Sequence, residues 1–99
     1  EGLSMARVPE YSDNNHWLNL LQIEIKNYAK DCGTLMTHLA TNGIQTRPVW
    51  TLNHRQKPYR ECQNYKIEKA EIIKAKSLCL PSSSNLHDED LAKIIKILS

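Results

Sequence analysis

The apolar residues of this chain lie in short segments whose spacing changes between that of a β-strand and that of an α-helix. In HWLNLLQIEI, residues 16–25, alternate side chains form two faces, and one of them becomes polar toward its end. This is typical of a strand whose two sides are covered unequally. In AKDCGTLMTHLATN, residues 29–42, apolar side chains recur at helical spacing. No apolar run approaches the roughly 20 residues that a membrane span requires. The chain must therefore fold by packing short elements on one another.

Later segments continue the pattern. GIQTRPVW (43–50) predicts a strand at the edge of a sheet, because Pro48 cannot donate to a central ladder. Residues 65–76 predict a helix, SLCLP (77–81) a strand, and HDEDLAKIIKIL (87–98) a final helix. The order strand, helix, strand, helix, strand, helix predicts an α+β fold, in which a few mainly antiparallel strands are covered by about three helices.

The ends of the predicted helices carry recognisable signals. Gly43 follows the first helix and suits the left-handed cap position, whereas Gly33 inside that helix weakens it by about 1 kcal/mol relative to alanine. The acids of the last helix, residues 88–90, fall at the positive end of its dipole, which accounts for them without a metal site. The buried stripe of this helix is expected to consist of Leu91, Ile94, Ile95 and Leu98.

Length, charge and cysteine content exclude several classes of protein. A chain of 99 residues supports one small domain and a modest core. Thirteen basic and eleven acidic residues leave a formal net charge of +2, so electrostatics do not call for a nucleic acid or a membrane as partner. Cys32, Cys62 and Cys79 are widely spaced, and no CxxC or CxxH pair is present. We therefore expect free, buried thiols in a reducing cytoplasm and no metal site.

A basic, aromatic stretch, GIQTRPVWTLNHRQKPYR at residues 43–60, contains no acid. Arginine binds phosphate or carboxylate in a bidentate manner, and flat aromatic rings offer stacking surfaces. Three interpretations are open: a nucleic-acid surface, a site for a phosphorylated small molecule, or a solvated loop whose arginines cover the edge of the core. Residue types alone favour the solvated loop. The relevant side chains are Arg47, Trp50, His54, Arg55, Lys57, Tyr59 and Arg60.

Three short motifs follow one another from this stretch to the C-terminus. They comprise Gly43, Ile44, Thr46 and Arg47; then His54, Gln56, Tyr59 and Arg60; then Leu80, Pro81, Leu86, Glu89 and Asp90. In this order and spacing they resemble the C-terminal end of the DegT/DnrJ/EryC1/StrS family, pyridoxal-phosphate aminotransferases that act on nucleotide-linked keto-sugars. The resemblance covers roughly residues 11–98 and is closest to the branch that makes amino sugars for nonulosonates of the legionaminic type. One departure is His87, where the family usually has threonine or serine.

The resemblance implies a fold-type-I enzyme of which residues 16–99 form the small C-terminal domain and residues 1–15 the connection from a large domain. The Schiff-base lysine, the acid beside the pyridinium nitrogen and the phosphate-binding groups are then expected upstream. None of the lysines here stands in a recognisable cofactor-lysine context. Pyridoxal phosphate would thus be bound mainly by the large domain of a cytoplasmic enzyme, and the chain alone should be inactive.

The resemblance also assigns expected roles and partners. His54 is expected nearest the cofactor, while Arg47, Tyr59 and Arg60 either meet carboxylate or phosphate groups of the substrate or brace the loop. The partners would be a nucleotide-linked keto-sugar, an amino-acid donor such as glutamate, the large domain and a second subunit of a homodimer. The pathway would be surface-polysaccharide or amino-sugar biosynthesis. Two alternatives are a small phosphate- or nucleic-acid-binding module that uses residues 47–60, and a protein-interaction domain with an apolar sheet face.

Overall fold

A four-stranded antiparallel sheet lies at the centre of the molecule, in a computed structural model that describes residues 1–99. The strand order is β1-β2-β4-β3. The last strand in sequence is thus inserted between the second and the third, and it pairs with both. The strands are β1 (Leu3–Met5), β2 (Asn19–Ile23), β3 (Arg47–Pro48) and β4 (Ser77–Leu80).

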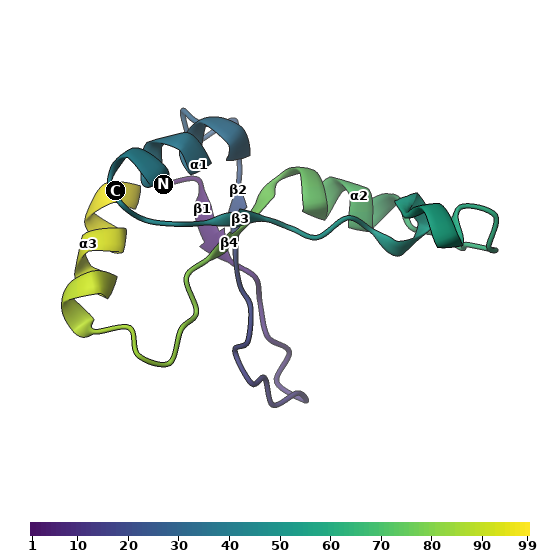
Figure 1. Cartoon of the computed structure of the whole chain (residues 1–99), viewed down its shortest axis with the longest axis horizontal. Helices are drawn as coiled ribbons and strands as arrows, with labels where there is room; N and C mark the ends of the chain where they lie inside the picture. The colour runs from purple at the N-terminus through teal and green to yellow at the C-terminus, as the bar shows by residue number, and fades with distance from the viewer.

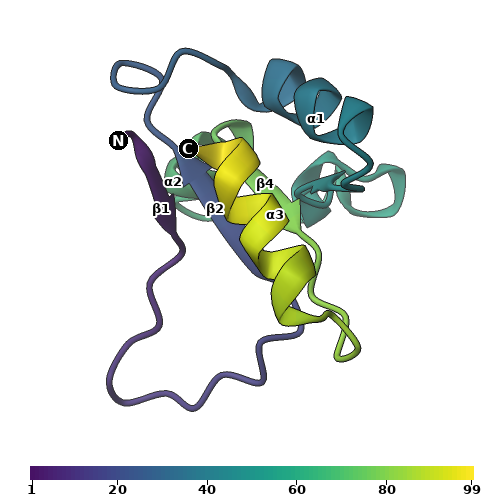
Figure 2. The same cartoon turned by 90° about the vertical axis from the view of Figure 1, so that its left-hand side faces the viewer.

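Helices lie on both sides of this sheet. The helices α1 (Cys32–Thr41) and α3 (Asp88–Leu98) lie on one side, whereas α2 (Glu68–Ala75) extends away from the other side together with two single-turn 3₁₀ helices (Figure 1). Seen from the first side, α3 crosses in front of β2 and β4, with α2 behind (Figure 2). The predicted α+β class and the order of the predicted elements are confirmed. No helix has the length and apolar character needed to cross a membrane.

The core is small and lies between the sheet and the two helices α1 and α3. Leu35 and Leu39 have no exposed surface, which confirms the apolar stripe predicted for α1. The sheet contributes alternate residues of β2, as expected from the period-2 pattern. The seven core residues are Leu21, Ile23, Leu35, Leu39, Ile44, Leu78 and Ile94.

Both ends of α1 are set by side-chain and backbone hydrogen bonds. Asp31 caps the N-terminus, since its carboxylate accepts from the Thr34 N–H at 2.7 Å. At the C-terminus the Gly43 N–H donates to the Ala40 carbonyl, and the Ile44 N–H donates back to the Leu39 carbonyl at 2.9 Å. These two bonds form a Schellman motif, which requires a left-handed residue, and Gly43 has φ +76°. The motif places Ile44 in the core.

The last helix is less buried than its sequence predicts. Ile94 is buried and Leu98 half-buried, but Leu91 is 45% exposed and Ile95 64% exposed. The expected four-residue stripe is therefore wrong at two positions, because α3 faces the core with Ile94, Ile97 and Leu98, whereas Leu91 and Ile95 lie on a neighbouring flank of the helix. The acids at its start are in the first turn, as predicted. Asp90 accepts from the His87 N–H at 3.2 Å, so its carboxylate satisfies the backbone donor of the N-cap residue.

Three details differ from expectation. Residues 3–5 form β1, a strand that was not predicted inside the segment 1–15. The strand expected at 43–50 is only two residues long, because residues 43 and 44 belong to the C-terminal cap of α1. β3 lies at the edge of the sheet, as predicted. Cys62 is exposed, so the expectation of buried thiols holds only for Cys79 and in part for Cys32.

Much of the apolar surface remains uncovered. Only 9 of 99 residues are buried, and the chain exposes 8092 Å². A compact monomer of this mass would expose about 5,800 Å². Trp17 and Trp50 illustrate the excess: their rings pack edge to face at 5.8 Å, yet each is more than 60% exposed. The fold thus leaves apolar side chains available for contact with another protein surface.

Candidate functional site

The segment between β3 and α2 carries three of the four predicted site residues, His54, Tyr59 and Arg60, and the fourth, Arg47, lies in β3. After β3 the chain forms two 3₁₀ turns, η1 (Asn53–Arg55) and η2 (Lys57–Tyr59), and then returns to α2. The Gln56 side chain stabilises this turn, since its amide donates to the Thr51 carbonyl at 3.0 Å. The loop is therefore held by its own hydrogen bonds and is not an unstructured connection.

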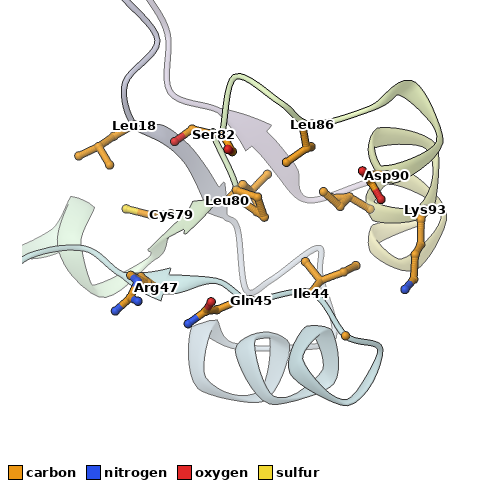
Figure 3. Close-up of a pocket in the computed structure, with 14 residues that line it drawn as sticks. Leu18, Ile44, Gln45, Arg47, Cys79, Leu80, Ser82, Leu86, Asp90 and Lys93 are labelled. Atoms are coloured by element: carbon orange, nitrogen blue, oxygen red, sulfur yellow. The ribbon is translucent and has the colours of Figure 1, made fainter.

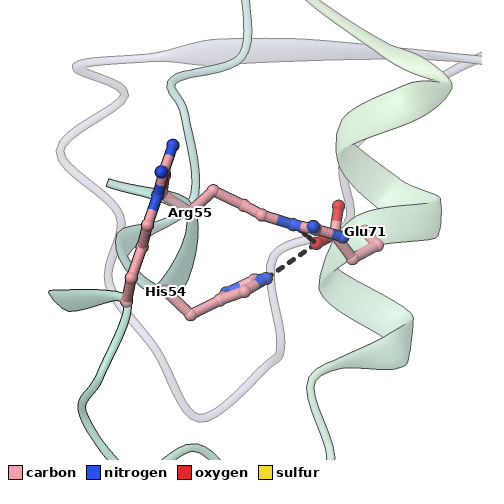
Figure 4. A network of polar contacts seen from close by, with 4 residues as sticks. His54, Arg55 and Glu71 are labelled. Carbon is pink, nitrogen blue, oxygen red and sulfur yellow. Dashed lines mark hydrogen bonds and ion pairs between the residues drawn. The ribbon is translucent and has the colours of Figure 1, made fainter. Parts of the chain in front are cut away.

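His54 is joined to α2 by a hydrogen bond with the Glu71 carboxylate. Its Nε2 lies 2.7 Å from Oε1 of Glu71, and Nε of Arg55 donates to the same oxygen at 2.7 Å (Figure 4). The His54 side chain is only 17% exposed, whereas that of Arg55 is 66% exposed. The hydrogen bonds from Arg55 and His54 hold the pKa of the Glu71 carboxyl below its ordinary value. Glu71 is therefore ionised at neutral pH and fixes the His54 ring against α2.

Arg47 lies apart from this cluster and lines two hollows of the surface. The first is an open cleft of about 740 Å³ between β3 and the 3₁₀ turns, in which Arg47 and Lys57 are the charged residues and no acid is present. Such a cleft is suited to an anionic group. The other residues that line it are Pro48, Val49, Trp50, Thr51, Gln56 and Pro58.

The second hollow is an apolar pocket of about 420 Å³ between the end of α1, β4 and α3. Ile44, Leu80 and Leu86 are among its apolar lining residues. Arg47 stands at one end, and Asp90 and Lys93 stand at the other (Figure 3). Arg47 is therefore the candidate that connects the cationic cleft with the apolar pocket.

Tyr59 and Arg60 are positioned less firmly. Tyr59 is 47% exposed and lines neither hollow. Arg60 is exposed, and its Nε donates to the Arg55 carbonyl at 3.4 Å, a long hydrogen bond within the loop. The four predicted site residues thus fall into two groups, the Arg47 cleft and the His54 cluster with the turn that follows it. Glu71, which the sequence analysis did not select, joins the second group.

Several solved structures share this fold. The chain aligns over 98% of its length with DesI, solved in the presence of its TDP-sugar product, at a TM-score of 0.81 and 23% identity. It aligns equally fully with the sugar aminotransferase CalS13 from Micromonospora echinospora (TM-score 0.78, 14% identity) and with the aminotransferase TlmJ from Streptoalloteichus hindustanus (TM-score 0.77, 18% identity). In each case it covers only 24–25% of the other chain. The sheet and its three helices are thus the fold of the C-terminal part of sugar aminotransferases.

The sequence gives the same assignment at the level of the family. The model of the DegT/DnrJ/EryC1/StrS aminotransferase family matches residues 1–99, and the chain belongs to that family. Its members are pyridoxal phosphate-dependent aminotransferases. A relative in Bacillus subtilis (strain 168), assigned as the pyridoxal phosphate-dependent aminotransferase EpsN, is 28% identical over 97 residues. These residues cover 92% of this chain and 24% of the relative, so the chain spans about a quarter of that protein's length.

The residues of this chain do not by themselves fit the cofactor. Pyridoxal phosphate enzymes need a lysine for the imine and an acid beside the ring nitrogen. Lys57 and Lys93 line the two hollows and both are exposed. The cleft of Lys57 has no acid, and the carboxylate near Lys93, that of Asp90, is used by the N-terminus of α3. The two hollows of this chain therefore do not supply both groups.

Proposed function

We propose that this chain is the small C-terminal domain of a pyridoxal phosphate-dependent aminotransferase that aminates a nucleotide-linked keto-sugar. An amino acid, glutamate in the simplest case, is the donor, and the product serves surface-polysaccharide or amino-sugar biosynthesis of the nonulosonate type. The observation that carries this proposal is the family match across residues 1–99. The full-length enzyme is a cytoplasmic homodimer, and the isolated chain is inactive because the cofactor lysine lies in the rest of the protein.

The exposed apolar surface supports a covering domain. The chain exposes 8092 Å², well above the area of about 5,800 Å² for a compact monomer of its mass. Buried side chains number only nine, so the domain gains much of its stability by packing against other parts of the enzyme. Residues 16–99 form the domain in this proposal, with residues 1–15 as its connection, although residues 3–5 also extend the sheet.

The cationic cleft supports an anionic substrate. Arg47 and Lys57 bind the phosphates of the nucleotide or the carboxylate of the donor, and the apolar side chains of Pro48 and Trp50 line the same cleft. His54 lies on the adjacent turn and contacts the substrate near the cofactor. Tyr59 and Arg60 stabilise this turn and stay exposed, and Nε of Arg60 donates a long hydrogen bond to the Arg55 carbonyl within it.

The proposal is tested with the full-length protein, pyridoxal phosphate, glutamate and a panel of nucleoside-diphosphate-linked keto-sugars. Formation of 2-oxoglutarate that depends on one of these sugars is expected, whereas the 99-residue chain alone should form none. Arg47→Ala should raise the KM for the sugar nucleotide about tenfold or more, because losing a charge-assisted hydrogen bond usually weakens binding by at least that factor. Arg7→Ala, an exposed arginine outside the cleft, serves as the control. If none of the keto-sugars on the panel is aminated, the proposal is contradicted.

A further inference from the structure

The carboxylate of Glu71 determines which nitrogen of His54 carries a proton. An ionised carboxylate only accepts hydrogen bonds, so a ring nitrogen 2.7 Å from Glu71 Oε1 must donate. That nitrogen is Nε2. The neutral imidazole bound in this way consequently has its lone pair on Nδ1.

Glu71 is held in its ionised form by a neighbouring cation, Arg55. Nε of Arg55 donates to the same oxygen at 2.7 Å, and Arg55 lies next to His54 on the same turn. The two hydrogen bonds lower the pKa of Glu71, so the carboxylate stays ionised and remains an acceptor. Glu71 comes from α2, which starts only after the turn has ended, so the contact also fixes the turn to a helix.

The other ring nitrogen is open to a ligand. Nδ1 of His54 has no hydrogen-bond partner in the chain. The only buried side-chain polar atoms without a partner are Thr46 Oγ1 and Ser77 Oγ, so Nδ1 is accessible from solvent. An accessible lone pair on a ring that is otherwise only 17% exposed is a directed acceptor for an O–H or N–H group.

We propose that Glu71 is a positioning residue that holds His54 with its proton on Nε2, so that Nδ1 accepts a hydrogen bond from a hydroxyl or amino group of the substrate. The assignment of the substrate contact rests on the function proposed above, whereas the position of the proton does not. A sugar ring, which is rich in hydroxyl donors, is the part of a nucleotide-linked sugar that this nitrogen recognises.

The proton position is tested by NMR on the ¹⁵N-labelled chain. Two-bond couplings distinguish the nitrogens, because Nε2 couples to both carbon-bound ring protons and Nδ1 to only one of them strongly. We expect the His54 proton on Nε2, visible as a one-bond cross-peak because the hydrogen bond slows its exchange. Glu71→Ala should abolish this cross-peak. Glu68→Ala, in the same first turn of α2 and without a hydrogen-bond partner for its side chain, should leave it unchanged.

Glu71→Gln guards against a folding defect, because it preserves the size of the side chain and removes its charge. This variant should weaken the Nε2 cross-peak while the backbone amide signals of β2 and β4 stay in place. A proton found on Nδ1, or a cross-peak that survives Glu71→Ala, would overturn the proposal.

The substrate contact is tested by a double-mutant cycle in the full-length enzyme with the sugar nucleotide that it aminates. Glu71→Ala should lower kcat/KM about 3- to 10-fold, the value of one neutral hydrogen bond, and Glu68→Ala should have no effect. If Glu71 acts through His54, the double variant loses no more activity than His54→Ala alone. Losses that simply add would refute the substrate contact. An enzyme without transaminase activity would refute the proposed function, while the NMR result would still decide the position of the proton.

Discussion

Gly33, inside α1, and Gly43, just after it, should respond to substitution by alanine with opposite changes in stability. Gly43 has φ +76°, in the left-handed region that the Schellman motif requires. Gly33 lies inside α1, where alanine is the best helix former. A Cβ at either position meets no close atom: the nearest neighbours are Lys93 Nζ at 3.7 Å and Asp31 Oδ1 at 3.6 Å. The difference between the two substitutions is therefore conformational and not steric.

The expected magnitudes follow from this difference. Gly43→Ala forces a Cβ into the left-handed conformation and should lower the free energy of unfolding by about 1–2 kcal/mol. Gly33→Ala restricts the unfolded chain at a position whose native conformation alanine adopts, and should raise it by about 0.4–1 kcal/mol. The two variants are then separated by about 1.5–3 kcal/mol. For a chain of this size, with a urea slope of about 1 kcal/mol per M, the midpoints should differ by about 1.5 M or more.

Urea unfolding followed by far-UV circular dichroism measures both variants against the parent chain. The slopes should be equal, because neither substitution alters the surface exposed on unfolding. Destabilisation by Gly33→Ala, or a neutral effect of Gly43→Ala, would refute the reasoning. The latter result would mean that the hydrogen bonds of the Ala40 and Leu39 carbonyls do not depend on the left-handed conformation.

Three further results are expected. Leu39→Ala should lower the free energy of unfolding by about 2–5 kcal/mol, because this side chain is fully buried. Leu91 is 45% exposed, so Leu91→Ala should lower it by less than about 1 kcal/mol. Equal losses of stability in urea unfolding would contradict the position of the core. The hydrogen bonds of Glu71 with Arg55 and His54 should be complete above the ordinary carboxyl pKa of 4.5 and should be lost as the pH falls through its lowered value. The protection of the amides in residues 53–59, taken relative to their intrinsic exchange rate at each pH, should therefore fall there, but not in Glu71→Gln. Iodoacetamide should modify Cys62 first, since it is exposed, and Cys79 last, since it is the one buried thiol; burial raises the pKa of both Cys79 and Cys32, so accessibility decides their order. Any other order of modification, read by mass spectrometry of the digested protein, would contradict this expectation.

Local patterns predicted the elements best where each pattern has one physical cause. The stripe of Leu35 and Leu39 specified α1, and Gly43 specified its end, because helical spacing and the left-handed cap depend only on neighbouring residues. The stripe of α3 was predicted wrongly at Leu91 and Ile95, because the face that a helix turns to the core depends on the elements that pack against it. Strand β1 was not predicted, because three residues are too few to show the alternation of side chains that is typical of a strand.

The candidate site divides in the same way. His54, Arg47, Tyr59 and Arg60 were selected from an ordered series of motifs, and their roles remain predictions. Glu71 was not selected, because it is 17 residues from His54 and lies among other charged residues of a surface helix. No spacing rule joins a 3₁₀ turn to a later helix, so only the packed structure shows this contact.

By itself, the sequence determined the α+β class, the glycine-capped end of α1, the acidic start of α3 and the resemblance to an aminotransferase family. These properties depend on residues that are close together in the chain or that occur as motifs in a fixed order. The tertiary structure decided which faces are covered, that β4 lies between β2 and β3, and that His54 shares the carboxylate of Glu71 with Arg55. These features depend on contacts between distant segments, whose geometry is fixed only when the sheet and the helices pack together.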